Sequence, residues 1–212
     1  MSGSGRCVVA ISRQVGAGGA YVGQALARAL GVRYVDREIL KEAASLLGRD
    51  TAEIENLEER VSSLWSRMAG ALAWGGPEAT YMPPPMPALY EEDLFAVQAR
   101  IIRQIAAQEE AVFVGRAATW ILRERADLIS VFLHAPEAVR VERVMREYKL
   151  SDLEEARKMV SRSDQQRSRF LQSVTGGSWF DVTHYHLCVD TGAVSLDDTV
   201  SLLVGLAATR RG

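Results

Sequence analysis

Short apolar runs alternate along the chain with segments in which apolar residues recur every three or four positions. Runs of this length, rich in β-branched residues, are typical of buried strands. The predicted strands are Cys7–Ile11, Val32–Val35, Ala111–Val114, Ile129–Leu133 and Leu187–Val189. Strands that alternate with helices form a parallel sheet covered on both faces, so the pattern predicts an α/β fold.

The helical segments are bounded by residues that cap helices. Asp36 and Asp50 are expected to cap two of them, and Ser151 with Glu154 resembles a capping box. The predicted helices are Tyr21–Leu30, Arg37–Leu47, Thr51–Leu72, Glu91–Gln108, a charged helix from Ser151 to about Phe170, and Ser195–Leu206. Further helices are expected after the third and fourth strands.

One segment, Trp74–Tyr90, matches neither the apolar runs of the strands nor the three-to-four-residue spacing of the helices. It contains Gly-Gly-Pro and Met-Pro-Pro-Pro-Met-Pro, which are incompatible with a helix interior or a central strand. We expect a long loop here, mobile in the absence of ligand, and long loops in compact domains are often lids or binding segments.

Composition narrows the class of protein. The chain has 212 residues with a formal net charge of −2, so it lacks the global basic character of a nucleic-acid-binding protein. No apolar run reaches the length of a membrane span, and Met1–Gly5 lacks the apolar core of a signal peptide, so a cytoplasmic location is expected. Cys7 and Cys188 lie in apolar runs and are expected to be buried strand residues.

The Gly-rich turn between the first strand and the first helix is the main candidate site. Glycines let backbone N–H groups approach a phosphate, and the helix N-terminus adds partial positive charge. The alternative is a tight turn without a ligand. The residues expected to bind the phosphates of a nucleotide cofactor are Ser12, Gly16, Ala17, Gly18, Gly19, Ala20 and Tyr21.

Neither common phosphate motif is present in full. The dinucleotide motif Gly-x-Gly-x-x-Gly requires glycine at position 21, which is Tyr21, although Asp36 is placed to hold a ribose. The Walker motif requires lysine and a hydroxyl residue where this chain has Gly19 and Ala20. An NAD-binding domain therefore stays a weaker alternative.

Taken together, several stretches resemble the cytidylate kinase-like family of nucleoside-monophosphate kinases. They occur in the family's order over nearly the whole chain. The matching stretches are Ile11–Gly19, Tyr34–Leu40, Val112–Ala118, Val131–Val144, Asp164–Arg167 and Val189–Thr191. The resemblance implies one P-loop domain over 1–212 with a three-layer fold and a five-stranded parallel sheet. It also implies an acceptor-binding, mobile insertion at about 50–90 and an arginine-rich lid at about 150–180.

The resemblance further implies an ATP-dependent, Mg²⁺-assisted kinase whose partners are small nucleotides. Phosphoryl transfer needs positive charge around the transferring oxygens. Arg13, placed inside the Gly-rich loop, is expected to replace the missing lysine, and a plain surface arginine is the alternative. Arg116 follows the third strand, where true cytidylate kinases have Gly-Arg-Asp and this chain has Gly-Arg-Ala. By the resemblance, Arg116 is expected to bind the acceptor phosphate and to take part in catalysis.

Other charged residues are assigned by the same resemblance. Asp36 and Arg37 are expected on the acceptor side. Arg162, Asp164 and Arg167, near the end of the charged helix, are expected in the lid, with Asp164 and Arg167 touching substrate. Ion pairs on an ordinary amphipathic helix are the alternative. Arg140 and Arg143 either serve the acceptor site or form a solvated helix face.

Two function hypotheses follow. The first is ATP-dependent phosphoryl transfer to a nucleoside monophosphate, a pyrimidine such as CMP. The second is a non-catalytic nucleotide-binding or regulatory module that has lost the lysine. The Mg²⁺ ligands are not identifiable from the sequence. His184 and His186 are spaced as a pair that could bind a metal ion, but no third ligand is evident, so a metal site is not expected there. The apolar residues of Thr51–Leu72 suggest a homodimer.

Overall fold

Five parallel strands form the centre of the molecule in the order β2-β3-β1-β4-β5. The computed structural model describes residues 6–36, 88–115 and 117–211. The strands are β1 Val8–Arg13, β2 Arg33–Val35, β3 Ala111–Val114, β4 Leu128–His134 and β5 Leu187–Asp190. The helices are α1 Gly19–Leu30, α4 Ala88–Gln108, α5 Ala118–Ile121, α6 Glu137–Tyr148, α7 Leu153–Thr175, a short 3₁₀ helix η1 Val182–His184, and α8 Leu196–Arg211. The predicted α/β class and five-stranded parallel sheet are confirmed.

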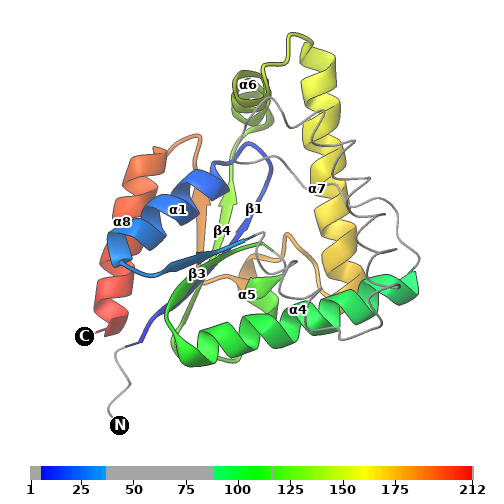
Figure 1. The fold of residues 1–212 in the computed structure, drawn as a ribbon. Coiled ribbons are helices and arrows are strands. Elements are labelled where there is room, and N and C mark those ends of the chain that lie inside the picture. Colours follow the sequence, from blue (N-terminus) through cyan, green and yellow to red (C-terminus); the bar gives the residue numbers. More distant parts are fainter. Residues whose placement is uncertain (1–5, 37–87, 116, 212) are drawn as a thin grey trace.

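Side chains that alternate along β1 divide the core into two layers. Val8 and Ala10 pack with residues of α4 and α5, whereas Val9 and Ile11 pack with residues of α1 and α8. Figure 1 shows α1 and α8 side by side on one face of the sheet and α4 with α5 on the other. Both faces are covered, which explains why the strands read as continuous apolar runs.

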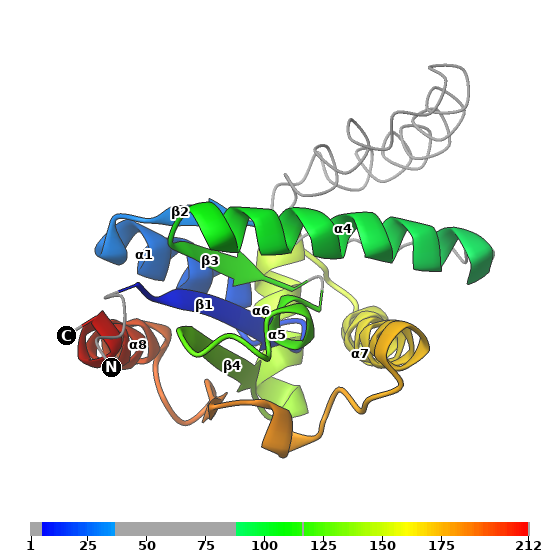
Figure 2. The same ribbon diagram turned by 90° about the horizontal axis from the view of Figure 1, so that it is seen from below.

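Helices α6 and α7 form a smaller third cluster beyond the carboxyl ends of the strands. Val15, which follows β1, packs with Val141 and Val144 of α6 and with Ala156 and Val160 of α7. Figure 2 shows α7 alongside the core, away from the α1 and α8 layer. The turn after β1 is therefore part of the packing between the sheet and these two helices.

The first strand is longer than the sequence suggests. Ser12 and Arg13 pair in parallel register with Phe132 and Leu133 of β4, so β1 ends at Arg13 instead of Ile11. Placing Arg13 inside the Gly-rich loop was therefore wrong. Polar residues at the end of a strand carry no apolar signal, and backbone pairing with β4 is what extends the strand.

Some helix ends also differ. Helix α4 begins at Ala88, directly after the last proline, so the predicted loop was wrong for residues 88–90. Helix α7 is capped by Asp152, whose carboxylate accepts from the backbone N–H groups of Glu154 and Glu155, and not by Ser151. It continues to Thr175, beyond the predicted end at about Phe170.

The last helix, α8, begins after Ser195, whose hydroxyl accepts from the backbone N–H of Asp198, and it continues to Arg211 instead of Leu206. Cys7 is buried but lies just before β1, and Cys188 in β5 is only partly buried.

Two predicted helices, Arg37–Leu47 and Thr51–Leu72, lie outside the described residues, as does nearly all of the predicted loop Trp74–Tyr90. Among the helices that are described, none has the length and apolar character needed to cross a bilayer.

Candidate functional site

The Gly-rich turn joins β1 to α1 at the carboxyl edge of the sheet. Gly16 and Gly18 have φ values of 76° and 77°, in the left-handed region that favours glycine, and Gly18 is the N-cap of α1. The backbone N–H of Ala17 donates to the carbonyl of Gln14 at 3.2 Å, which closes the turn. The positive end of α1 therefore faces the edge where ligands bind in open α/β sheets.

Each glycine of this turn is also required by a protein neighbour. A Cβ added at Gly16 would lie 2.9 Å from the Cα of Arg140, and one at Gly18 would overlap the side chain of Leu196. The glycine content is thus explained by packing and backbone conformation. Phosphate binding would depend on the helix N-terminus and on the surrounding cations.

The carbonyl groups of the turn are held from two other elements. Arg143 of α6 donates from Nη1 to the carbonyl of Gly16 at 3.3 Å and from Nη2 to the carbonyl of Thr191 at 2.7 Å. The hydroxyl of Thr191 donates to the carbonyl of Ala17 at 3.0 Å. These contacts fix the turn against α6 and against the connection that follows β5.

The side chain of Arg13 crosses the carboxyl ends of three neighbouring strands. Its stem runs past Gly19, and its guanidinium lies against Gly115, which follows β3. Nη2 is 4.0 Å from Oδ1 of Asp36, which follows β2, and the two side chains are 18% and 14% exposed. Tyr34 donates to Asp36 at 3.3 Å, and burial, with the nearby Asp36 charge, raises the pKa of the Tyr34 hydroxyl.

A second charged cluster joins helix α7 to the turn. Asp164 accepts hydrogen bonds from Nη1 of Arg140 at 2.7 Å, from Nε2 of Gln14 at 3.0 Å and from the backbone N–H of Val15 at 3.4 Å. Arg140 and Asp164 are 8% and 13% exposed. Burial raises the pKa of Asp164, while the charges of Arg140 and Arg167 and the hydrogen bond from Val15 lower it without offsetting the burial.

The other arginines of α7 face different surroundings. Arg162 and Arg169 are exposed, whereas Arg167 is partly buried and close enough to Asp164 to influence its pKa. Arg162 and Arg167 lie in the middle of α7, so the prediction that they lie near the end of a helix was wrong, because α7 is longer than expected. Asp164 and Arg167 share a face, as their spacing predicts.

The first and last residues of the predicted phosphate-binding set, Ser12 and Tyr21, make hydrogen bonds to other side chains of the protein. The hydroxyl of Ser12 accepts from Nε1 of Trp179 at 2.8 Å. The hydroxyl of Tyr21 donates to Asp197 at the start of α8, and this hydrogen bond raises the pKa of Tyr21. Ala20 is buried in the first turn of α1.

Two predicted site residues, Arg37 and Arg116, lie outside the described part of the chain. Their assigned roles on the acceptor side stay predictions.

Several residues that hold the turn were not assigned to it from the sequence. Arg140 was placed either in the acceptor site or on a solvated helix face, yet it is buried beside Asp164. Its position four residues before the buried Val144 puts both on one side of α6, which is a signal that could have identified it. Gln14, Thr191 and Trp179 carry no periodic signal, because each lies in a turn or connection.

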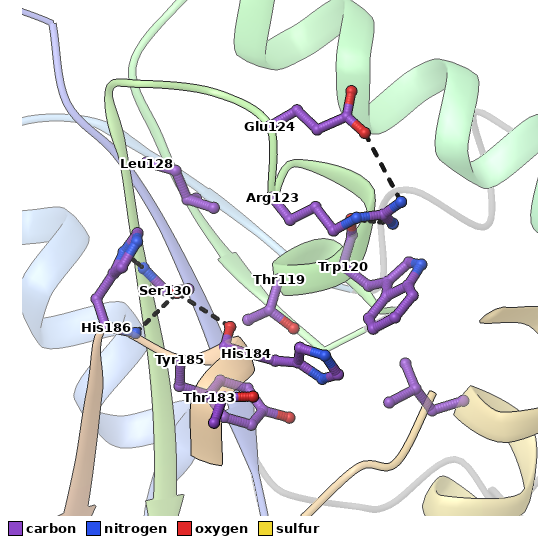
Figure 3. Close-up of a pocket in the computed structure, with 11 residues that line it drawn as sticks. Thr119, Trp120, Arg123, Glu124, Leu128, Ser130, Thr183, His184, Tyr185 and His186 are labelled. Carbon is purple, nitrogen blue, oxygen red and sulfur yellow. Dashed lines mark hydrogen bonds and ion pairs between the residues drawn. The ribbon is translucent and has the colours of Figure 1, made fainter. Parts of the chain in front are cut away.

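A cavity of about 380 Å³ lies elsewhere, between α5, the start of β4 and η1 (Figure 3). Trp120 and His184 meet edge to face there, with ring centroids 4.8 Å apart, and the guanidinium of Arg123 lies 4.4 Å from the centre of the Trp120 ring. The N–H of Ser130 donates to Nδ1 of His186 at 3.1 Å. No residue of the Gly-rich turn lines this cavity, so it is separate from the predicted site.

Within the described ranges, no three His, Cys, Asp or Glu side chains are grouped so that they could hold a metal ion. Mg²⁺ commonly uses one or two carboxylates together with substrate phosphates. Asp36 is the carboxylate placed at the mouth of the sheet beside Arg13.

Known proteins with similar sequences or similar structures agree with the fold described above. The model of the "Cytidylate kinase-like family" matches residues 8–193. A cytidylate kinase of Pyrobaculum neutrophilum is 28% identical over 203 residues, which cover 95% of this chain and 93% of the relative. A protein from Eubacterium ventriosum, titled as uncharacterized, superposes with a TM-score of 0.69 at 22% identity and covers 95% of this chain and 98% of the other.

A shikimate kinase of Bacteroides thetaiotaomicron superposes with a TM-score of 0.51 at 15% identity, covering 94% of this chain and 97% of that enzyme. At this level of identity, both structures show the fold alone. The family match covers most of the chain and confirms the resemblance deduced from the motifs, together with the kinase class of enzyme. The chain belongs to the cytidylate kinase-like family.

Proposed function

We propose that the protein transfers a phosphoryl group from ATP to a nucleoside monophosphate, and that the acceptor is a pyrimidine nucleotide such as CMP. The proposal rests on family membership, on a Gly-rich turn at the N-terminus of α1, and on charges gathered at the carboxyl edge of the sheet. The choice of CMP follows from the family resemblance, and relatives such as the cytidylate kinase of Pyrobaculum neutrophilum support it.

The observation that carries the proposal is the position of Arg13. Its guanidinium lies at the carboxyl ends of β1, β3 and β2, next to the turn that leads into the N-terminus of α1. Its separation of 4.0 Å from Asp36 is too long for a good hydrogen bond. A cation held here, mostly out of solvent, is suited to stabilise charge on a transferring phosphoryl group.

The remaining roles follow the family resemblance. Arg116 and Arg37 would bind the acceptor phosphate, and Arg162 and Arg167 would approach the phosphates from α7, which corresponds to the lid. Asp164 would act by connecting α7 to the phosphate-binding turn, because its carboxylate is already committed to that turn. Arg167 is partly buried close to Asp164, whereas Arg162 is exposed, so Arg167 is the better placed of the two to approach the phosphates.

ATP would place its phosphates at the turn Gly16–Ala20, and Mg²⁺ would neutralise phosphate charge during transfer. The chain provides no hydroxyl at Ala20, so we propose that the ion is held mainly by phosphate oxygens, with Asp36 as the nearby carboxylate. A cytoplasmic location and a homodimer stay predictions from the sequence.

A second candidate function is nucleotide binding without turnover. Gly19 and Ala20 replace the lysine and hydroxyl of the Walker motif, and the glycines of the turn are explained by packing alone. A protein that kept the fold for regulation would show the same features, because packing and positive φ values account for these glycines without a ligand.

The test is the formation of ADP from ATP and Mg²⁺ with a panel of nucleoside monophosphates. The first function predicts ADP formation that depends on one acceptor, with a pyrimidine preferred. The second predicts saturable ATP binding without acceptor-dependent ADP.

A further inference from the structure

Arg13 and Gly19 occupy exchanged positions relative to the Walker motif. When Gly18 is taken as the second glycine of Gly-x-x-x-x-Gly-Lys-[Ser/Thr], the first glycine falls at position 13 and the lysine at position 19. This chain has arginine at 13 and glycine at 19. The motif therefore still contains one cationic residue, but that residue is at position 13 instead of 19.

The structure shows why the two positions depend on one another. A Cβ added at Gly19 would lie 2.9 Å from the Cβ of Arg13 and closer still to its Cγ. The Cβ of Arg13 cannot move aside without a shift of β1, and its Cγ can do so only if the side chain leaves its present path. Any side chain at 19, lysine included, is incompatible with Arg13 in this position.

Gly115 supplies the space for the other end of the same side chain. A Cβ there would overlap Nη1 of Arg13 and lie 3.0 Å from its Cζ, and the φ of Gly115 is 79°. Two glycines from different segments thus leave a path for one arginine. The path ends beside Asp36, at the side of the sheet away from β4.

We propose that Arg13 is the relocated cation of the nucleotide-binding turn, and that Gly19 is glycine because the stem of Arg13 passes over it. This inference rests on the proposed ATP site. It adds that the charge now comes from the last residue of β1 instead of the first turn of α1. The guanidinium is thereby directed toward the ends of β3 and β2, which places it between the turn and the acceptor side.

An ordinary structural role for Arg13 makes a different prediction. If its function were only to pair with Asp36 and fill space, removing its charge would change stability and leave nucleotide affinity unaltered. A lysine introduced at 19 would then have no reason to compensate for the loss of Arg13.

The experiment is a double-mutant cycle on ATP affinity, measured by calorimetric titration of ATP with Mg²⁺. The four proteins are the parent, R13G, G19K and R13G/G19K. We expect R13G to bind ATP about tenfold to a hundredfold more weakly, because a charged hydrogen bond to phosphate is lost. G19K alone should bind as weakly, because its side chain collides with Arg13, whereas the double variant should return to within a few-fold of the parent.

Additional variants separate charge from folding. R13Q keeps most of the stem without the charge, so it should retain the parent's melting temperature and lose ATP affinity, and R13K should recover part of that affinity. R33A, which removes a cation at the amino end of β2, should bind ATP as the parent does.

Parent-like affinity in R13Q, a double variant no better than the weaker single variant, or a parent that does not bind ATP would each overturn the relocation. Failure of the proposed kinase reaction is a separate result. Compensation in the ATP titration without acceptor-dependent turnover would support the relocated cation in a binding module. Turnover that is unaffected by R13Q would support the kinase and reject the relocation.

Discussion

Removing the carboxylate of Asp164 should destabilise the protein strongly, because its partner Arg140 would be left buried without its counter-charge. The two side chains are 13% and 8% exposed, and their closest N–O distance is 2.7 Å. Breaking a buried ion pair by truncating one partner typically costs about 3–5 kcal/mol. Asp164 also accepts from Gln14 and from the backbone N–H of Val15, so D164A removes three hydrogen bonds at once.

The measurement is urea unfolding and thermal melting of D164A beside the parent. A loss of about 3 kcal/mol in a domain of this size corresponds to a fall in melting temperature of about 6–12 °C. The matched control is E154A, which breaks the exposed pair of Glu154 with Arg157 on the same helix, 3.0 Å apart. Exposed pairs contribute about 0.2–1 kcal/mol, so E154A should change stability by no more than that.

The apolar double variant R140M/D164L provides a second check. Replacing both charges avoids the unpaired guanidinium, so its loss of stability should be smaller than that of D164A. If D164A were no more destabilising than E154A, the contact between α7 and the Gly-rich turn would contribute little, and the reasoning from burial would be wrong.

Three further outcomes follow from contacts around the turn. W179F removes the donor to Ser12 and part of a buried ring, so it should lower the free energy of unfolding in urea by at least about 1 kcal/mol. R143A releases the carbonyl of Gly16 and should weaken ATP binding in a calorimetric titration. The loss of binding free energy should exceed the loss of unfolding free energy measured in urea. Burial raises the pKa of Asp164 above the usual 3.8, so the native state binds its proton more tightly than the unfolded chain does. The unfolding free energy of the parent relative to D164N should therefore fall as pH rises from 3.8 through the raised pKa, which urea unfolding at several pH values would measure.

The fold could be predicted from the sequence because its strands are short apolar runs. The strand Ala111–Val114 has the predicted bounds, since it is buried on both faces and lies between charged and glycine residues. The end of β1 could not be located in this way. Ser12 and Arg13 are polar, and only their pairing with β4 makes them part of the strand.

The site was predictable in outline and not in its contacts. The motif locates the turn. The ion pair that fixes it could not be predicted, because Arg140 lies on α6 and its partner Asp164 is 24 residues away in the sequence. Local periodicity carries no information about such a pair. The role of Gly19 likewise depends on the path of the Arg13 side chain, which the sequence does not specify.

The central claim is that this protein moves a phosphoryl group onto a nucleoside monophosphate. The most direct test incubates the purified protein with ATP, Mg²⁺ and CMP and quantifies ADP and CDP together by chromatography, with UMP, AMP and GMP as parallel acceptors. The account predicts equal amounts of ADP and nucleoside diphosphate with CMP, UMP or GMP, and two ADP for each AMP consumed. It also predicts the highest rate with a pyrimidine acceptor and a large loss of rate in R13Q. ATP binding with no nucleoside diphosphate formed from any of the four acceptors would contradict it.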